Sequence, residues 1–298
     1  MQKLRISSGG VADGSRGFRA RGDITAQFYG ADAPPERRPL QTRRAGHILV
    51  PMVVQVVLVH GIRTSATMWR AQVAAMQERG NPVNAVDLPG HGTRMAEEFT
   101  LESAFETIDS AVRDAASRGP VLLAGHSMGG LLSIGYVGAE DPPPVAGFIA
   151  ASCTSIPRGL GLQTYRVLAR GFDSLPDRGM WLTNRLLDRI LPDETRADFG
   201  AGGYALDAQD IALRSLSVLD LLAALHRIDV PIWFINGQFD QLRINERLFL
   251  RVAQHAELVV VPRTTHHVTV MRPGVFNALL NLAITTIDSE QDREPPST

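Results

Sequence analysis

A serine between glycines stands in the sequence GHSMG at residues 125–129, directly after an apolar run at 121–124. The spacing fits G-x-S-x-G, in which a sharp strand-to-helix turn exposes the serine hydroxyl. Glycines two residues before and after the serine remove the side chains that would clash in this strained turn. The turn also places the serine at the amino end of a helix, where developing negative charge is favoured. The pattern predicts that Ser127 is a nucleophile.

A serine hydroxyl has too high a pKa to attack a carbonyl unaided, so it needs a base. Asp240 follows an apolar run at 230–236, and His266 and His267 follow the last apolar run at 258–261. An aspartate accepting an imidazole N–H would fix the tautomer of the histidine and stabilise its charged form. The alternative for Asp240 is a helix-capping residue.

The segment Gly-His-Ser-Met-Gly-Gly after Val-Leu-Leu-Ala resembles the α/β-hydrolase superfamily, particularly its lidded carboxylesterase-like members, over about residues 53–287. The resemblance implies an α/β fold: a mostly parallel, doubly wound sheet with a helical lid insertion. It also implies a catalytic set in the chain order Ser127, Asp240, His266.

The resemblance favours His266 as the base because Pro273 stands seven residues later, as is common in the family. The residue before this histidine is usually glycine, and here it is Thr265. This departure keeps His267 open as the alternative base.

In the same family, backbone amides form an oxyanion hole, worth about 3–4 kcal/mol per donor in comparable sites. By position these amides belong to Ile62, in the His-Gly-Ile segment at 60–62, and to Met128. The alternative for residues 60–62 is an ordinary turn at the end of a strand. Candidate residues of the substrate pocket are Arg63, His126, Trp181 and His267.

Short apolar runs alternate with helix-like stretches from residue 52 onward, which predicts a parallel sheet covered on both faces. Strands are expected at 53–59, 83–88, 121–124, 145–151, 230–236 and 258–261, and helices at 66–78, 101–116 and 128–138. We expect a hydrolase core at 51–153 and 230–290, a helical lid at 154–229, a weakly ordered extension at 1–50 and a tail at 291–298.

The predicted lid contains aromatic residues and leucines at helical spacing. The aromatic residues are Tyr165, Phe172, Trp181, Phe199 and Tyr204. They either pack a small core of the insertion or line an apolar pocket from above, and different faces of the same helices can do both.

Composition excludes several classes of partner. The formal net charge is −1, which gives no electrostatic reason to expect nucleic acid or an anionic membrane. The single cysteine, Cys153, cannot form an internal disulfide, which favours a reducing, cytoplasmic location. No metal-ligand spacing or glycine-rich phosphate loop occurs, so we expect no cofactor and no metal. We expect no membrane span, and a monomer or homodimer.

The predicted function is hydrolysis of an apolar carboxylic ester or lactone through an acyl-enzyme on Ser127. The alternatives are a C–C bond hydrolase or a thioesterase with the same residues, and, in another class, a non-catalytic ligand-binding receptor. Cofactor-independent oxygenases of this fold are a more distant option. A serine at this position argues against the epoxide hydrolases and haloalkane dehalogenases, which use an aspartate nucleophile.

Overall fold

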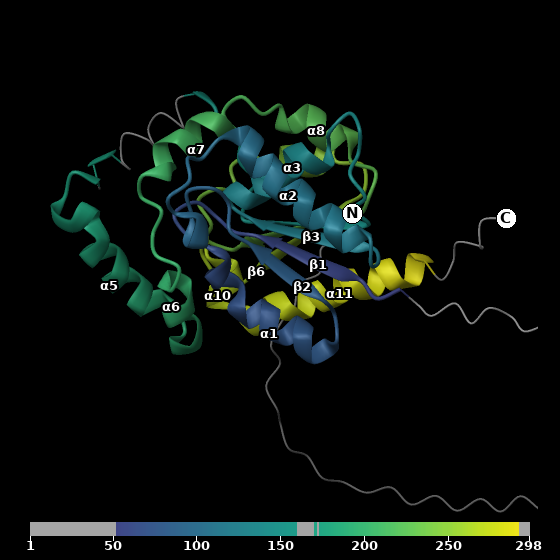
Figure 1. The fold of residues 1–298 in the computed structure, drawn as a ribbon, viewed down its shortest axis with the longest axis horizontal. Helices are drawn as coiled ribbons and strands as arrows, with labels where there is room; N and C mark the ends of the chain where they lie inside the picture. Colours follow the sequence, from purple (N-terminus) through teal and green to yellow (C-terminus); the bar gives the residue numbers. More distant parts are fainter. Residues whose placement is uncertain (1–51, 160–169, 172, 292–298) are drawn as a thin grey trace, which may run out of the picture. The chain divides into compact units, whose positions relative to one another are not determined.

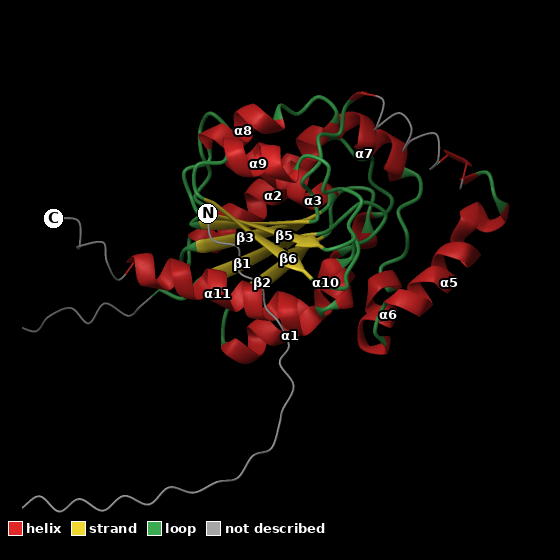
Figure 2. Cartoon of the chain, turned by 180° about the vertical axis from the view of Figure 1, so that it is seen from behind, coloured by secondary structure: helices red, strands yellow, loops and turns green. Residues whose placement is uncertain are grey.

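The computed structural model describes residues 52–159, 170, 171 and 173–291. Their strands form one sheet of six, in the order β2-β1-β3-β4-β5-β6, and every neighbouring pair is parallel (Figures 1 and 2). The strands are β1 (Gln55–Val59), β2 (Val83–Val86), β3 (Val121–His126), β4 (Gly147–Ala151), β5 (Ile232–Gly237) and β6 (Ala256–Val261). The predicted fold class is thereby confirmed.

The four inner strands are buried along their whole length, which explains why they are continuous apolar runs rather than alternating patterns. The two edge strands, β2 and β6, are only partly buried. The predicted strand at 83–88 ends at Val86, because the chain there turns into the loop that contains Asp87.

Helices cover both faces of the sheet (Figures 1 and 2). One face carries α2 (Leu101–Ala116), α3 (Met128–Val137), α8 (Leu221–Arg227) and α9 (Glu246–Val252), and the other carries α1 (Arg70–Arg79) and α11 (Pro273–Gln291). The predicted helix at 66–78 is divided into a 3₁₀ turn, η1 (Ala66–Trp69), and α1.

Helix α2 shows how local sequence sets these boundaries. Its N-cap is Thr100, whose side chain accepts a hydrogen bond from the Ser103 N–H, while the Ser103 hydroxyl accepts one from the Thr100 N–H. This reciprocal capping satisfies two donors that the first turn cannot satisfy itself. The buried side of the helix carries Ile108 and Val112, four residues apart, and packs into the core.

The described residues of the insertion between β4 and β5 form mainly helices joined by loops. Besides α8 it contains η3 (Pro176–Gly179), α5 (Met180–Ile190), α6 (Asp193–Gly200) and α7 (Ala208–Leu216). Helix α6 is attached to the core: the Thr195 hydroxyl donates to the Val270 carbonyl at 2.7 Å, and Asp198 pairs with Arg70 at 2.8 Å. Helices α5 and α6 lie beside the sheet rather than over its faces (Figures 1 and 2).

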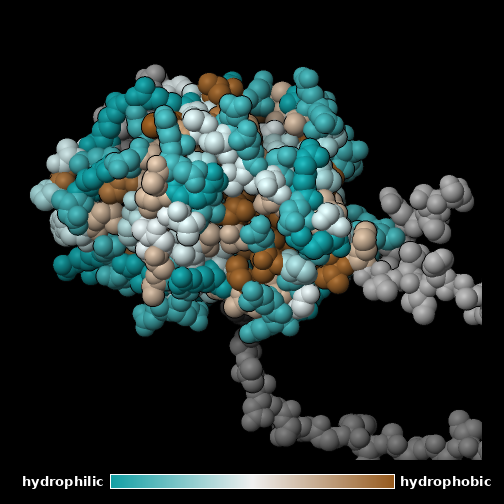
Figure 3. Space-filling model, in the orientation of Figure 1, coloured by the Kyte–Doolittle hydropathy of each residue, from teal (hydrophilic) through white to brown (hydrophobic). Residues whose placement is uncertain are grey.

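Some predictions lie outside the described residues: the N-terminal extension at 1–50, Tyr165 and Phe172 of the insertion, and nearly all of the tail at 291–298. Among the helices that are described, none is long and apolar enough to span a membrane. The face in Figure 3 is mostly hydrophilic and carries only small, separate hydrophobic areas.

Candidate active site

The candidate residues follow four different strands but reach the same edge of the sheet. Residues 60–62 follow β1, Ser127 follows β3, Asp240 follows β5 and His266 follows β6. All strands are parallel, so their carboxyl ends lie together. The strand order also reverses direction between β1 and β3, and such a reversal opens a crevice at the carboxyl ends where ligands bind in open α/β sheets.

Ser127 occupies a strained turn between β3 and α3. Its backbone has φ 53° and ψ −116°, outside the regions that L-residues normally adopt. The neighbouring glycines are required by space: a Cβ on Gly125 would lie 2.6 Å from the Gly129 carbonyl oxygen, and one on Gly129 would lie 2.4 Å from the His60 carbonyl oxygen. The close approach of α3 to β1 therefore depends on an absent side chain.

Ser127, His266 and Asp240 are joined by two hydrogen bonds. His266 Nε2 lies 2.9 Å from Ser127 Oγ, and His266 Nδ1 lies 3.1 Å from Asp240 Oδ1. The Leu242 N–H also donates to Asp240 Oδ1, at 2.8 Å. Burial alone would raise the pKa of Asp240, but the hydrogen bond and charge of His266 together lower it, so this carboxylate is ionised at neutral pH.

The adjacent histidine, His267, is not hydrogen-bonded to Ser127. Its ring packs edge-on against Phe199 of α6, with the ring centroids 5.1 Å apart, and forms part of a cavity wall. Burial, followed by the positive charge that His266 and His126 can carry, lowers the pKa of His267 well below its usual value. The geometry therefore favours His266 as the partner of the serine.

His126 connects the serine turn to the histidine loop. Its Nε2–H donates to the backbone carbonyl of His266 at 2.9 Å, and its Nδ1 is buried without a hydrogen-bond partner. Burial, then the charge of His266, lowers the pKa of His126 to about 3, so the ring is neutral. The sequence suggested only that this residue lines the pocket, because a backbone contact between residues 140 positions apart leaves no local signal.

The Gly61–Ile62 peptide is held in place through its carbonyl. The Gly61 oxygen accepts hydrogen bonds from His60 Nδ1–H and from the Thr64 hydroxyl, each at 2.8 Å. The tautomer of His60 is set because its Nε2 accepts the Leu88 N–H at 3.0 Å. In a trans peptide the N–H points away from the carbonyl, so the Ile62 N–H is directed to the side opposite these donors.

Asp87 supports the two loops on this side of the site. Its carboxylate accepts the Ala66 N–H at 2.7 Å and both the N–H and the hydroxyl of Thr93 at 2.8 Å. Burial would raise the pKa of Asp87, but these hydrogen bonds lower it below its usual value. The carboxylate thus links the start of η1 to the loop after β2.

Sequence reasoning did not identify the supporting roles of His60 and Thr64. Only the His-Gly dipeptide hinted at the role of His60.

A cavity of about 340 Å³ opens beside Ser127. Its wall contains Ile62 and Met128, the two residues proposed for the oxyanion hole, and Arg63, whose Nη2 lies 3.7 Å from Met180 Sδ. The rest of the wall is largely aliphatic and aromatic, with contributions from Leu131, Ile156, Leu187, Phe199, Leu213, Leu216, Leu242 and Ile244.

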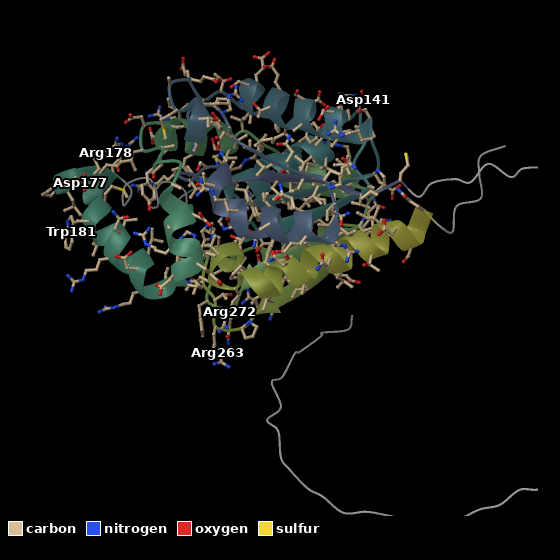
Figure 4. All side chains as sticks on the ribbon, turned by 60° about the horizontal axis from the view of Figure 1, so that its bottom comes forward. Asp141, Asp177, Arg178, Trp181, Arg263 and Arg272 are labelled. Atoms are coloured by element: carbon tan, nitrogen blue, oxygen red, sulfur yellow. The ribbon has the colours of Figure 1, made fainter. Side chains whose placement is uncertain are left out.

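The structure does not support the prediction that Trp181 belongs to the pocket. Its side chain is 55% exposed and points away from the molecule (Figure 4). The inner face of α5 instead carries Thr183 and Leu187, four residues apart, which line the cavity. Trp181 is two positions before Thr183, so the helical turn of about 100° per residue carries it to the outer face.

No group of three or more His, Cys, Asp or Glu side chains within the described ranges could hold a metal ion.

A model of the alpha/beta hydrolase family matches residues 56–279 of the chain. A pimeloyl-(acyl-carrier protein) methyl ester esterase of Neisseria meningitidis is 27% identical over 254 residues, which cover 76% of this chain and 92% of that protein. An (E)-2-((N-methylformamido)methylene)succinate hydrolase of Acinetobacter baylyi is 24% identical, covering 78% and 90%. The crystal structure of the enol-lactonase from Burkholderia xenovorans has a TM-score of 0.61 at 20% identity, covering 78% and 92%.

Proposed function

The chain belongs to the alpha/beta hydrolase family, and from this premise we propose that it is a serine hydrolase that cleaves a largely apolar carboxylic ester or lactone. The observation that carries the proposal is the hydrogen-bonded series Ser127–His266–Asp240 at the wall of an apolar cavity. Relatives named as an ester esterase and a succinate-derivative hydrolase support hydrolysis. The fold neighbour named as an enol-lactonase shows only that the same fold serves lactone cleavage.

In the first half of the proposed reaction, His266 Nε2 takes the proton from Ser127 Oγ as the oxygen attacks the substrate carbonyl. The negative oxygen that develops is stabilised by the N–H groups of Ile62 and Met128, which are fixed before the reaction begins. Asp240 stabilises the resulting imidazolium, because its ionised carboxylate accepts the Nδ1–H.

In the second half, His266 gives its proton to the leaving alcohol, and an acyl group remains on Ser127. A water molecule then gives up a proton to the same histidine and attacks the acyl-enzyme. The acid is released as His266 returns this proton to Ser127 Oγ. A cavity of about 340 Å³ with an apolar wall is suited to a compact acyl group rather than to a polymer or a highly charged substrate.

The proposal is tested with a fluorophosphonate probe and a panel of chromogenic esters and lactones. We expect wild-type protein to be labelled and to turn over members of the panel, and Ser127→Ala to lose both properties. The matched control is Ser133→Ala, since Ser133 is a buried serine on α3, the helix that follows Ser127, and its hydroxyl has no hydrogen-bond partner within the described structure.

The alternative functions predict results that differ from those expected for an esterase or lactonase. Labelling of Ser127 without turnover of any ester or lactone would favour a C–C bond hydrolase or a thioesterase, and matching substrates would then be assayed. Stoichiometric binding of a ligand with neither labelling nor turnover would contradict the proposal and favour a receptor.

A further inference from the structure

His267 presents a second imidazole to the cavity, and aromatic neighbours hold its ring in one place. The ring centroid lies 5.1 Å from that of Phe199, 5.5 Å from that of His266 and 6.2 Å from that of His126. A ring packed against three others cannot rotate away without losing these contacts. Its nitrogen atoms therefore have fixed positions beside the Ser127 site.

The two nitrogen atoms of His267 have different surroundings. Nδ1 is buried and has no hydrogen-bond partner among the described residues. Nε2 is not sealed from solvent in this way, and the ring forms part of the cavity wall. Nδ1 lacks a partner among these residues in either tautomer, but a buried N–H without an acceptor is tolerated less often than a bare acceptor, which favours the tautomer with the proton on Nε2. His267 thus offers an N–H donor to the cavity.

This donor carries no charge. Burial, and after it repulsion from His266 and His126, lowers the pKa of His267 well below its usual value. A neutral N–H can donate to an oxygen acceptor, but it adds no full positive charge that would offset the cost of burying an anion in a largely apolar cavity.

Three other hydroxyl groups on the cavity wall already use their hydrogen within the protein. The Thr64 hydroxyl donates to the Gly61 carbonyl, and the Thr183 hydroxyl donates to the Gly179 carbonyl. The Tyr204 hydroxyl donates to the Asn184 side chain. Each of these groups would have to give up a protein hydrogen bond to donate to a substrate, whereas His267 Nε2 would not.

We propose that His267 is a specificity-determining residue that selects substrates with a second, neutral oxygen acceptor, such as a keto, ether or additional ester oxygen. This inference rests on the proposed hydrolase function, and it narrows the substrate class from apolar esters to apolar esters or lactones with one further acceptor. A substrate without that acceptor leaves the imidazole N–H unpaired in a largely apolar cavity, and unpaired groups of this kind discriminate strongly between substrates.

The test compares two chromogenic esters of similar size, p-nitrophenyl levulinate, which has a keto oxygen, and p-nitrophenyl valerate, which has none. The readout is the ratio of their kcat/KM values, normalised to the ratio of their alkaline hydrolysis rates. We expect wild-type protein to prefer levulinate and His267→Phe to lower the ratio about tenfold. His267→Gln, which keeps an N–H donor, should retain more of the preference, and the exposed control His255→Phe should leave the ratio unchanged.

Two results would overturn the inference while leaving the proposed function intact. One is a wild-type protein that hydrolyses both esters without preference. The other is a His267→Phe variant that reacts normally with fluorophosphonate and keeps the wild-type ratio. If His267→Phe does not fold, the wild-type preference and the ratio in His267→Gln decide. If the wild-type protein neither hydrolyses these two esters nor is labelled by the fluorophosphonate probe, the proposed function is overturned, and this inference with it.

Discussion

Replacing His126 by leucine removes the hydrogen bond that ties the serine turn to the histidine loop. The bond runs from His126 Nε2–H to the His266 carbonyl at 2.9 Å, in a place where His126 is only 2% exposed. Leucine has a similar volume and no polar atom, so the substitution chiefly deletes the donor. His266 itself then keeps its side-chain partners but loses the anchor on its backbone.

The magnitude follows from the burial of this contact. A hydrogen bond between neutral groups contributes about 1 kcal/mol net, and a buried carbonyl left without a donor costs about 1–3 kcal/mol. If about 2 kcal/mol of this total appears as misplacement of His266 in the transition state, kcat falls about 30-fold. We expect KM to change much less than kcat, because the imidazole that moves is the proposed base.

The assay measures kcat and KM on a chromogenic ester, together with the midpoint of thermal unfolding. His126→Gln is the matched variant, since its side-chain amide can place an N–H near the position of Nε2 and should recover part of kcat. The anchoring argument is refuted if His126→Leu retains wild-type kcat. It is also refuted if His126→Gln and His126→Leu are equally impaired at equal stability.

Two further predictions concern stability. Gly129→Ala should lower the free energy of unfolding by about 3 kcal/mol or more, because the new Cβ would lie 2.4 Å from the His60 carbonyl oxygen. The control is Gly274→Ala in α11, where a Cβ would meet no atom of the described residues within 4 Å. In the same urea titration this variant should be as stable as the wild type or slightly more stable. Asp87→Asn should cost about 2 kcal/mol at pH 7 through weakened hydrogen bonds to Ala66 and Thr93. The folded-state pKa of Asp87 is below its unfolded value, so its contribution is present above about pH 4 and lost as the pH falls through the folded pKa. A difference between wild type and Asp87→Asn that stays constant from pH 7 to pH 3 would contradict this.

The sheet could be predicted from sequence because parallel strands buried on both faces appear as short apolar runs. All six expected runs are strands, and the helix expected at 101–116 has the observed bounds, Leu101–Ala116. These features depend on residues close together in the chain: an apolar stripe, a capping threonine and a following turn. Two predicted boundaries were wrong, at η1 and at the end of β2. The two places are joined by a contact between residues distant in the chain, in which the Ala66 N–H donates to the Asp87 carboxylate.

Ser127 could be named from its own motif, and Asp240 and His266 could be named because they stand where the family resemblance implies an acid and a base after a strand. Their distances could not be predicted, because the serine and histidine are 139 residues apart and meet only when strands β3 and β6 lie in one sheet. The family resemblance favoured His266 over His267, but it left the alternative open. Adjacent residues project in different directions, and the path of the loop after β6 directs the first ring to Ser127 and the second to Phe199.

The sequence by itself determined the elements, their parallel arrangement and the residue types that reach the edge of the sheet. Only the tertiary structure decided which groups support them, namely the His126 anchor and the side-chain donors on the Gly61 carbonyl. It also decided that Trp181 lies on the outward face of its helix. The physical reason is the distance along the chain over which each kind of interaction acts. Hydrophobic periodicity and turn chemistry act over a few residues and leave a pattern in the sequence. A hydrogen bond between loops, or the rotation of a helix over a cavity, depends on how separate elements pack and leaves no such pattern.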